Sequence, residues 1–151
     1  MSRARLAAIA WAAISLAGCA SLRARPPMAE RSEIVVSLQV PAECASALVM
    51  SAFGKNQLEV TSSQPGVVEA SLPRQRGLSG YYDLFARAVI TPGENGMATV
   101  TLFAEETQYA DDGVTRIGSS RASERSLGRA AEVWEKLQGV ARTLRSEGVK
   151  S

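Results

Sequence analysis

The sequence predicts an α+β domain of two layers, in which helices cover an antiparallel sheet of about five strands. Several segments alternate between apolar and polar residues, as half-buried strands do. Apolar residues at helical spacing follow the first of these segments and recur over a longer stretch near the end of the chain. Elements that are apolar on one side bury those sides against each other, so we expect the order β-α-β-β-β-β-α, with a short first helix and a long last one.

The first predicted strand runs from Ile34 to Val40, where every second residue is apolar. Pro41 follows it and suits the first position of a helix. Apolar residues at helical spacing continue to Phe53, and Gly54 is placed to end the helix in a left-handed cap. We therefore expect a strand that is followed directly by an amphipathic helix.

Four more strands are expected before the last helix, over 58–62, 67–72, 81–91 and 97–105. The last two alternate most clearly, and the short turn between them predicts an antiparallel hairpin. We expect a loop over 73–80, which contains arginines and two glycines. The polar segment 106–118 is either a loop or a ragged extension of the hairpin.

The last helix is expected to begin at Leu127, where apolar residues start to recur at steps of three and four. These residues are Leu127, Ala130, Trp134, Leu137, Ala141 and Leu144. Ser120 or Ser123 is suited to cap the helix, and Gly139 interrupts it at a cost of about 1 kcal/mol relative to alanine. Residues 34–151 are enough to bury a core without disulfides.

The first 19 residues indicate a targeting segment rather than part of the fold. Positive charge, an apolar run and a short motif succeed one another there, as Arg3 and Arg5, Leu6 to Ser15, and Leu16-Ala17-Gly18-Cys19. This pattern resembles the bacterial lipoprotein signal, whose lipobox reads Leu-Ala-Gly-Cys. The resemblance implies cleavage between Gly18 and Cys19 and attachment of acyl chains to Cys19. The alternative is an uncleaved membrane helix over residues 6–22, which is at the lower limit of length for spanning.

The lipoprotein resemblance also implies a location. Several acyl chains anchor a protein durably, because each buried methylene contributes about 0.8 kcal/mol. Enterobacterial lipoproteins that stay in the inner membrane tend to carry aspartate after the cysteine, so Ala20 favours the inner leaflet of the outer membrane, facing the periplasm. We expect a signal peptide over 1–18, a lipidated cysteine and flexible tether over 19–33, and a periplasmic domain over 34–151.

The predicted element order and the lipobox together resemble one family of envelope domains. These are the helix-grip domains of the lipoprotein C subunit in the outer-membrane β-barrel assembly machinery. The resemblance implies an α+β fold with a long C-terminal helix, and it assigns no functional residue to this chain.

Composition excludes several classes of function. The chain has no histidine, so histidine bases, histidine triads and histidine-ligated metals are excluded. Its formal charge is +2, and removal of the signal leaves 15 basic and 15 acidic residues, which argues against a broadly basic nucleic-acid binder. Cys44 is then the only ordinary thiol; we expect it to be a buried small residue or to form an intermolecular disulfide.

An acidic cluster is the only candidate for metal ligation. It contains Glu105, Glu106, Asp111 and Asp112. The spacing is not that of a calcium-binding EF-hand loop, and Asp112-Gly113 is a common turn pair. We therefore expect a solvated loop, with no metal site and no cofactor.

Two sets of residues are candidates for partner recognition. Tyr81, Phe85 and Phe103 fall on the hairpin faces opposite the apolar residues, and they form an interface if that side of the sheet is open. Alternatively, a loop or the tether covers them. Arg121, Arg125 and Arg129 recur every four residues and are predicted to line one helix face. That face is either a patch for phosphate, lipopolysaccharide or an acidic partner, or simply solvated.

These observations together favour a lipid-anchored, non-catalytic binding or accessory module in envelope biogenesis or transport, with an envelope protein as its partner. One alternative is a carrier of a small hydrophobic ligand or lipid, which needs a cavity between the sheet and the long helix. The other is an envelope enzyme, which needs convergent polar side chains in a cleft. The sequence leaves open the oligomeric state and whether the helices cover one face of the sheet or both.

Overall fold

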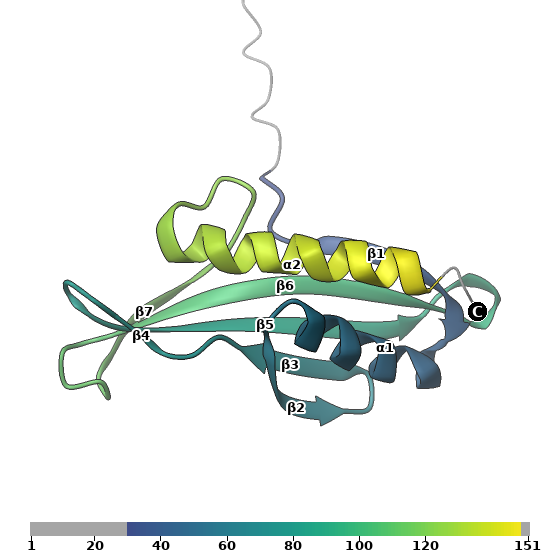
Figure 1. Ribbon diagram of the computed structural model, residues 1–151, viewed down its shortest axis with the longest axis horizontal. Helices are drawn as coiled ribbons and strands as arrows, with labels where there is room; N and C mark the ends of the chain where they lie inside the picture. Colours follow the sequence, from purple (N-terminus) through teal and green to yellow (C-terminus); the bar gives the residue numbers. More distant parts are fainter. Residues whose placement is uncertain (1–29, 149–151) are drawn as a thin grey trace, which may run out of the picture.

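The computed structural model describes residues 30–148 of the 151-residue chain. The predicted signal peptide, the lipobox with Cys19 and most of the predicted tether lie outside these residues. Between residues 30 and 148, no helix is long and apolar enough to cross a membrane. The predicted α+β class is confirmed, with an antiparallel sheet, a short helix after the first strand and a long C-terminal helix (Figure 1).

The elements follow one another as β1 (Ile34–Pro41), α1 (Ala42–Lys55), β2 (Glu59–Gln64), β3 (Val67–Ser71), β4 (Gln75–Gly77), β5 (Gly80–Pro92), a short 3-10 turn (Glu94–Gly96), β6 (Met97–Tyr109), β7 (Arg116–Arg121) and α2 (Gly128–Glu147). The described part of the sheet has seven strands rather than about five. Of the two additional strands, β4 lies in the segment 73–80, where a loop is expected, and β7 begins within the segment 106–118 and extends three residues beyond it.

The sheet is built around the long hairpin of β5 and β6, which stay in one register from Tyr81 opposite Tyr109 to Pro92 opposite Ala98. Along one half of this hairpin the sheet has the order β1-β6-β5-β3-β2. Along the other half, β4 pairs with β5 and β7 pairs with β6. The same two strands are therefore flanked by different neighbours at their two ends (Figure 1).

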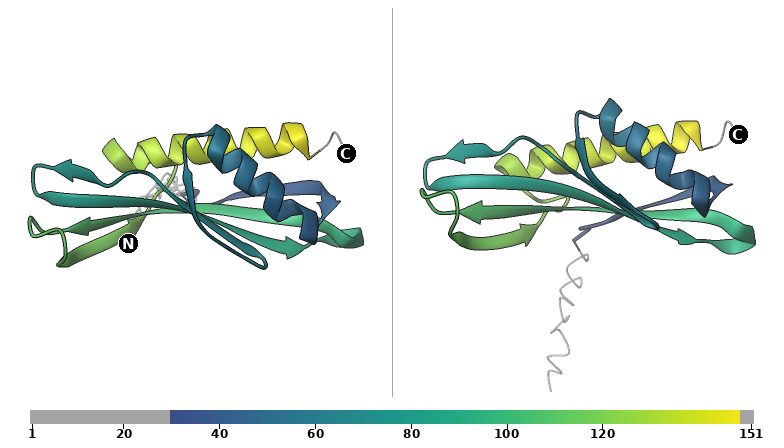
Figure 2. Two further views of the ribbon diagram at one scale, coloured as in Figure 1. Left: turned by 60° about the horizontal axis from the view of Figure 1, so that its bottom comes forward. Right: turned by 90° about the horizontal axis from the view of Figure 1, so that it is seen from below.

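Both helices lie on the same face of the sheet, and no helix of residues 30–148 covers the opposite face (Figure 2). The covered face carries the even-numbered residues of β5 and β6, such as Leu84, Ala88 and Leu102, which are fully buried. Alanines on these strands leave room for the helices to approach closely, and larger side chains such as Phe53 and Leu137 fill the layer between. The structure thus answers the question that the sequence left open: one face is covered.

The beginning of α2 differs from the prediction. Leu127 does not begin the buried stripe, because it is 88% exposed and precedes a helix that starts at Gly128, where φ is +62°. Ser120 and Ser123 do not cap α2, which has no side-chain cap; the hydroxyl of Ser123 instead donates a hydrogen bond to the carboxylate of Glu30. The buried stripe begins at Val133, one and a half turns into the helix.

Candidate functional site

The open face of the sheet is formed by the odd-numbered residues of β5 and β6, since their even-numbered neighbours point into the core. Tyr81 and Phe85 of β5 and Phe103 of β6 therefore lie on this face, as the alternation predicts. Phe85 is 40% exposed, whereas Tyr81 and Phe103 are half-buried. We call these residues and their neighbours the open face.

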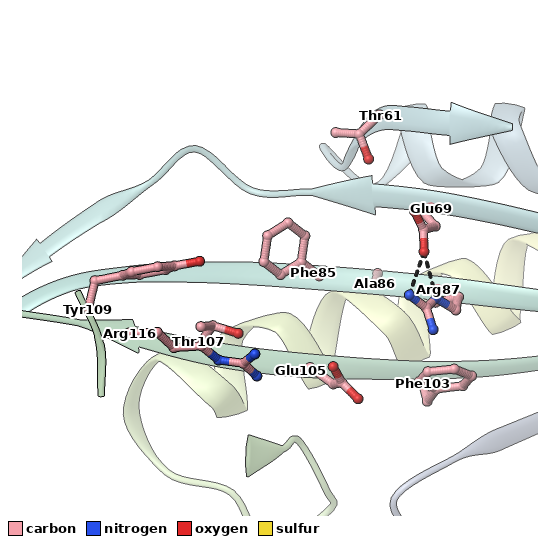
Figure 3. Close-up of a pocket in the computed structure, with 10 residues that line it drawn as sticks. All are labelled: Thr61, Glu69, Phe85, Ala86, Arg87, Phe103, Glu105, Thr107, Tyr109 and Arg116. Atoms are coloured by element: carbon pink, nitrogen blue, oxygen red, sulfur yellow. Dashed lines mark hydrogen bonds and ion pairs between the residues drawn. The ribbon is translucent and has the colours of Figure 1, made fainter. Parts of the chain in front are cut away.

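A shallow hollow of about 310 Å³ lies on the open face (Figure 3). Three aromatic rings line it, those of Phe85, Phe103 and Tyr109. Charged side chains contribute as well: Arg116 of β7 extends over the sheet toward Thr107 (Figure 3). The hollow thus combines aromatic surface with hydrogen-bonding groups, as sites that bind another molecule do.

Two ion pairs hold arginines against the open face. Arg87 Nε donates to Glu69 Oε1 at 2.7 Å, across the pairing of β5 with β3. Arg74 Nε and Nη2 donate to the two carboxylate oxygens of Asp83, each at 2.7 Å, and these hydrogen bonds raise the pKa of the Arg74 guanidinium. Bidentate pairs of this kind fix the position of both side chains.

Arginines also stack on the aromatic rings. The guanidinium carbons of Arg121 and Arg87 lie 4.6 and 5.7 Å from the centre of the Phe103 ring. Arg74 lies 4.8 Å from the ring centre of Tyr109, and Arg76 lies 5.6 Å from that of Tyr81. These distances are those of cation–π contacts. The open face therefore presents aromatic rings together with cations rather than bare apolar surface.

The predicted arginine patch is not a single surface. Arg121 ends β7, Arg125 lies in the connection, and Arg129 is in the first turn of α2, so they do not share a helix face. Arg129 lies on the helix-covered side, where its guanidinium is 4.2 Å from the ring centre of Tyr82, while Arg121 stacks on the open face. A four-residue spacing aligns side chains only within one helix, and here the helix begins at Gly128.

The acidic residues do not converge either. Within residues 30–148, no group of three or more His, Cys, Asp or Glu residues is placed to hold a metal ion. Asp112 is used in the turn between β6 and β7, where its carboxylate accepts hydrogen bonds from Thr115 Oγ1 and from the backbone N–H groups of Thr115 and Val114. These hydrogen bonds lower the pKa of Asp112, with the hydroxyl of Thr115 making the largest contribution.

Cys44 is exposed on α1, so the prediction that it is a buried small residue is wrong.

Two residues of the open face, Tyr109 and Arg116, are not among those predicted from the sequence. The sequence does contain a signal for Tyr109: extending the hairpin register from Thr91 opposite Thr99 puts Tyr109 opposite Tyr81.

No protein-family model matches the chain, and no curated protein matches it.

Proposed function

We propose that this chain is a lipid-anchored, non-catalytic binding module of the bacterial cell envelope, which recognises an envelope protein through the open face. The observation that carries the proposal is the lipobox Leu16-Ala17-Gly18-Cys19, which follows a positively charged start and an apolar run. By its resemblance to lipoproteins, this motif favours attachment to a membrane, with the inner leaflet of the outer membrane as the expected location.

The composition of the open face supports recognition of a protein. Aromatic residues and arginine are enriched in protein interfaces and account for many of the side chains whose loss weakens binding. Phe103 stacked under two arginines, on the same face as the partly exposed Phe85, is such a combination. An anchor raises the local concentration of the module near membrane partners, so a modest contact area is sufficient for binding.

The packing of the core favours surface recognition over the carriage of a ligand inside the fold. The apolar residues between the sheet and the helices are at most 8% exposed, and many are alanines and valines in close contact. A carrier needs a pocket in that layer that is large enough to enclose its ligand. The alternative of an enzyme lacks a histidine base, and the carboxylates of Glu69 and Asp83 are engaged with arginines.

The proposal is tested in two steps in a bacterium that lipidates its proteins. First, mass spectrometry of the mature chain is expected to find an N-terminus at an acylated Cys19, and the Cys19→Ser variant is expected to leave the membrane fraction. A mature protein that retains residues 1–18, or that lacks lipid on Cys19, contradicts the anchor.

Second, a photo-crosslinking amino acid is placed at Phe103 on the open face. The matched control carries it at Glu135, which is exposed on α2 on the other side of the molecule. We expect a defined protein adduct from position 103 and none from position 135. Adducts from position 135 alone, or from neither position, contradict recognition through the open face.

A further inference from the structure

We propose that one end of the sheet forms a second membrane contact beside the lipid anchor. This end, which we call the hairpin end, consists of the β4–β5 turn with Leu78, the β6–β7 turn with Val114, and the residues that lead into α2 with Leu127. Its binding partner is the surface of the bilayer that carries the anchor, so the inference rests on the proposed function.

The hairpin end is one surface because several contacts join its parts. Gly77 opposite Gly80 closes the β4–β5 turn, and Ala110 N donates to Thr115 O at 2.8 Å in the β6–β7 turn. Arg74, which directly precedes β4, donates from Nη1 to Gly113 O at 2.9 Å and so connects the start of β4 to the β6–β7 turn. The turns therefore lie side by side where β5 and β6 extend beyond the helices (Figures 1 and 2).

The three most exposed large apolar residues between positions 30 and 148 belong to the hairpin end. Leu78 is 108% exposed, Leu127 88% and Val114 80%. Leu78 lies at the tip of its turn, where neighbouring side chains leave it in solvent. Insertion of such tips into the lipid interface removes apolar surface from water without any change of fold.

The charges and tyrosines around these tips suit a phospholipid surface. Within the described part of the chain, the arginines at this end that form no ion pair with a carboxylate are Arg76, Arg116, Arg125 and Arg129. Guanidinium groups bind phosphate well, and tyrosine is favoured at the membrane interface. Four acidic residues, Asp111, Asp112, Glu124 and Glu132, lie at this end as well, so the arginines act as individual phosphate contacts rather than through a net positive charge.

The first described residues contact the segment that leads from β7 to Leu127. The hydroxyl of Ser123 donates to the carboxylate of Glu30, and Glu124 N donates to Arg31 O at 3.0 Å. Ser123 precedes Leu127 by only four residues. Further on, Arg129 Nη2 donates to Arg76 O at 3.4 Å, two residues before Leu78. Contacts thus lead from the start of the tether to two of the apolar tips.

The length of the tether keeps the hairpin end close to the membrane. Glu30 lies eleven positions after Cys19, and a chain of this length reaches at most about 40 Å when fully extended. The root-mean-square span of a random coil of this length is about 18 Å. An anchored molecule therefore has its hairpin end within reach of the bilayer, and contact there fixes an orientation that leaves the open face accessible from the side.

The test uses the full lipidated protein in vesicles of phosphatidylethanolamine and phosphatidylglycerol that contain brominated acyl chains. Leu78→Trp places a fluorophore at the hairpin end, and Val35→Trp is the matched control, since Val35 is 54% exposed on the open side of β1. Removal of the signal leaves Trp134 as the only native tryptophan, and it is buried in both variants. We expect quenching of Leu78→Trp to be several-fold stronger than that of Val35→Trp.

Equal quenching of the two variants overturns the proposal, as does a photo-crosslinker at Leu78 that joins the chain to a protein rather than to lipid. Flotation of the protein with the vesicles is measured in the same samples. Failure to float refutes the lipid anchor itself, whereas flotation without quenching of Leu78→Trp refutes the membrane contact alone.

Discussion

The backbone of Gly139 in α2 lies against the side chain of Asn56, which follows α1, so closely that an added Cβ would overlap with Oδ1. Asn56 is held in place, because its Nδ2 donates to Ala52 O at 2.8 Å and to Thr143 Oγ1 at 3.3 Å. The glycine that interrupts the helical pattern in the sequence therefore marks the site where the two helices meet.

We expect Gly139→Ala to lower the free energy of unfolding by about 1 kcal/mol, although alanine is the better helix former. The new methyl group displaces Asn56 from its hydrogen bonds, and that loss exceeds the gain in helix propensity. Gly54→Ala is the matched control, because Gly54 also lies inside a helix but has nothing within 4 Å of its Cβ position. This control should gain about 0.5–1 kcal/mol in urea unfolding. Equal stabilisation by both changes would show that Asn56 moves freely.

Leu102 and Phe103 are neighbours on β6 that face opposite sides of the sheet. We expect Leu102→Ala to cost about 2–5 kcal/mol, because it leaves a cavity in the core. Phe103→Ala should cost about 1 kcal/mol or less, since it removes a stacked ring from the open face. Denaturant unfolding of the two variants measures both effects. A large loss of stability in Phe103→Ala would place Phe103 in the core instead.

The proposed binding role further predicts that Phe103→Ala weakens the formation of protein adducts from a photo-crosslinker at Phe85.

Asp112 is expected to titrate below the ordinary value of 3.8, because three hydrogen bonds favour its charged form. The depressed pKa means that the carboxylate stabilises the folded turn above pH 3.8, and that this stabilisation is lost as the pH falls through the pKa of the folded state. Carboxyl NMR titration measures the midpoint. Thr115→Val removes the hydroxyl that contributes most, so it should raise the midpoint; an unchanged midpoint contradicts that cause.

Gly80 begins β5 with φ of +125°, and an added Cβ would overlap with the carbonyl oxygen of Tyr109. Gly80→Ala is therefore expected to destabilise the hairpin end by about 2 kcal/mol or more. Hydrogen exchange should show faster exchange in β4, β7 and the ends of β5 and β6, with little change in β1 and α2. Gly118→Ala on β7, where the Cβ position is open, serves as the control and should leave the exchange rates unaltered.

Most of the confirmed predictions rest on the alternation of apolar and polar residues, because this alternation shows which face of a strand is buried. β5 and β6 have one buried face, so the placement of Phe85 and Phe103 on the other face was readable, although β6 continues to Tyr109, four residues past its predicted end. β7 is exposed on both faces and β4 has only three residues, so neither leaves a periodic signal. Helical spacing was misleading at Leu127, because this residue has the same spacing as the apolar residues of α2 but precedes the helix.

The candidate site was predictable only in part for a related reason. Its aromatic residues follow from the pattern of single strands, whereas the stacking of Arg121 on Phe103 depends on the pairing of β7 with β6. The lipobox, the location and the resemblance to helix-grip domains stay predictions.

The pairing of β1 with β6 has a consequence for the order of folding. Ile34 and Leu102 are partners in the sheet although they lie 68 positions apart in the chain, whereas β5 and β6 are joined by a connection of only four residues. Local pairs close faster than distant ones, because less chain entropy is lost. The hairpin therefore forms early and β1 joins it late, so the strand that follows the tether is the last to complete the sheet. Until β1 arrives, the edge of β6 from Met97 to Leu102 stays unpaired, and that interval is when the molecule is most open to association with other unfolded chains.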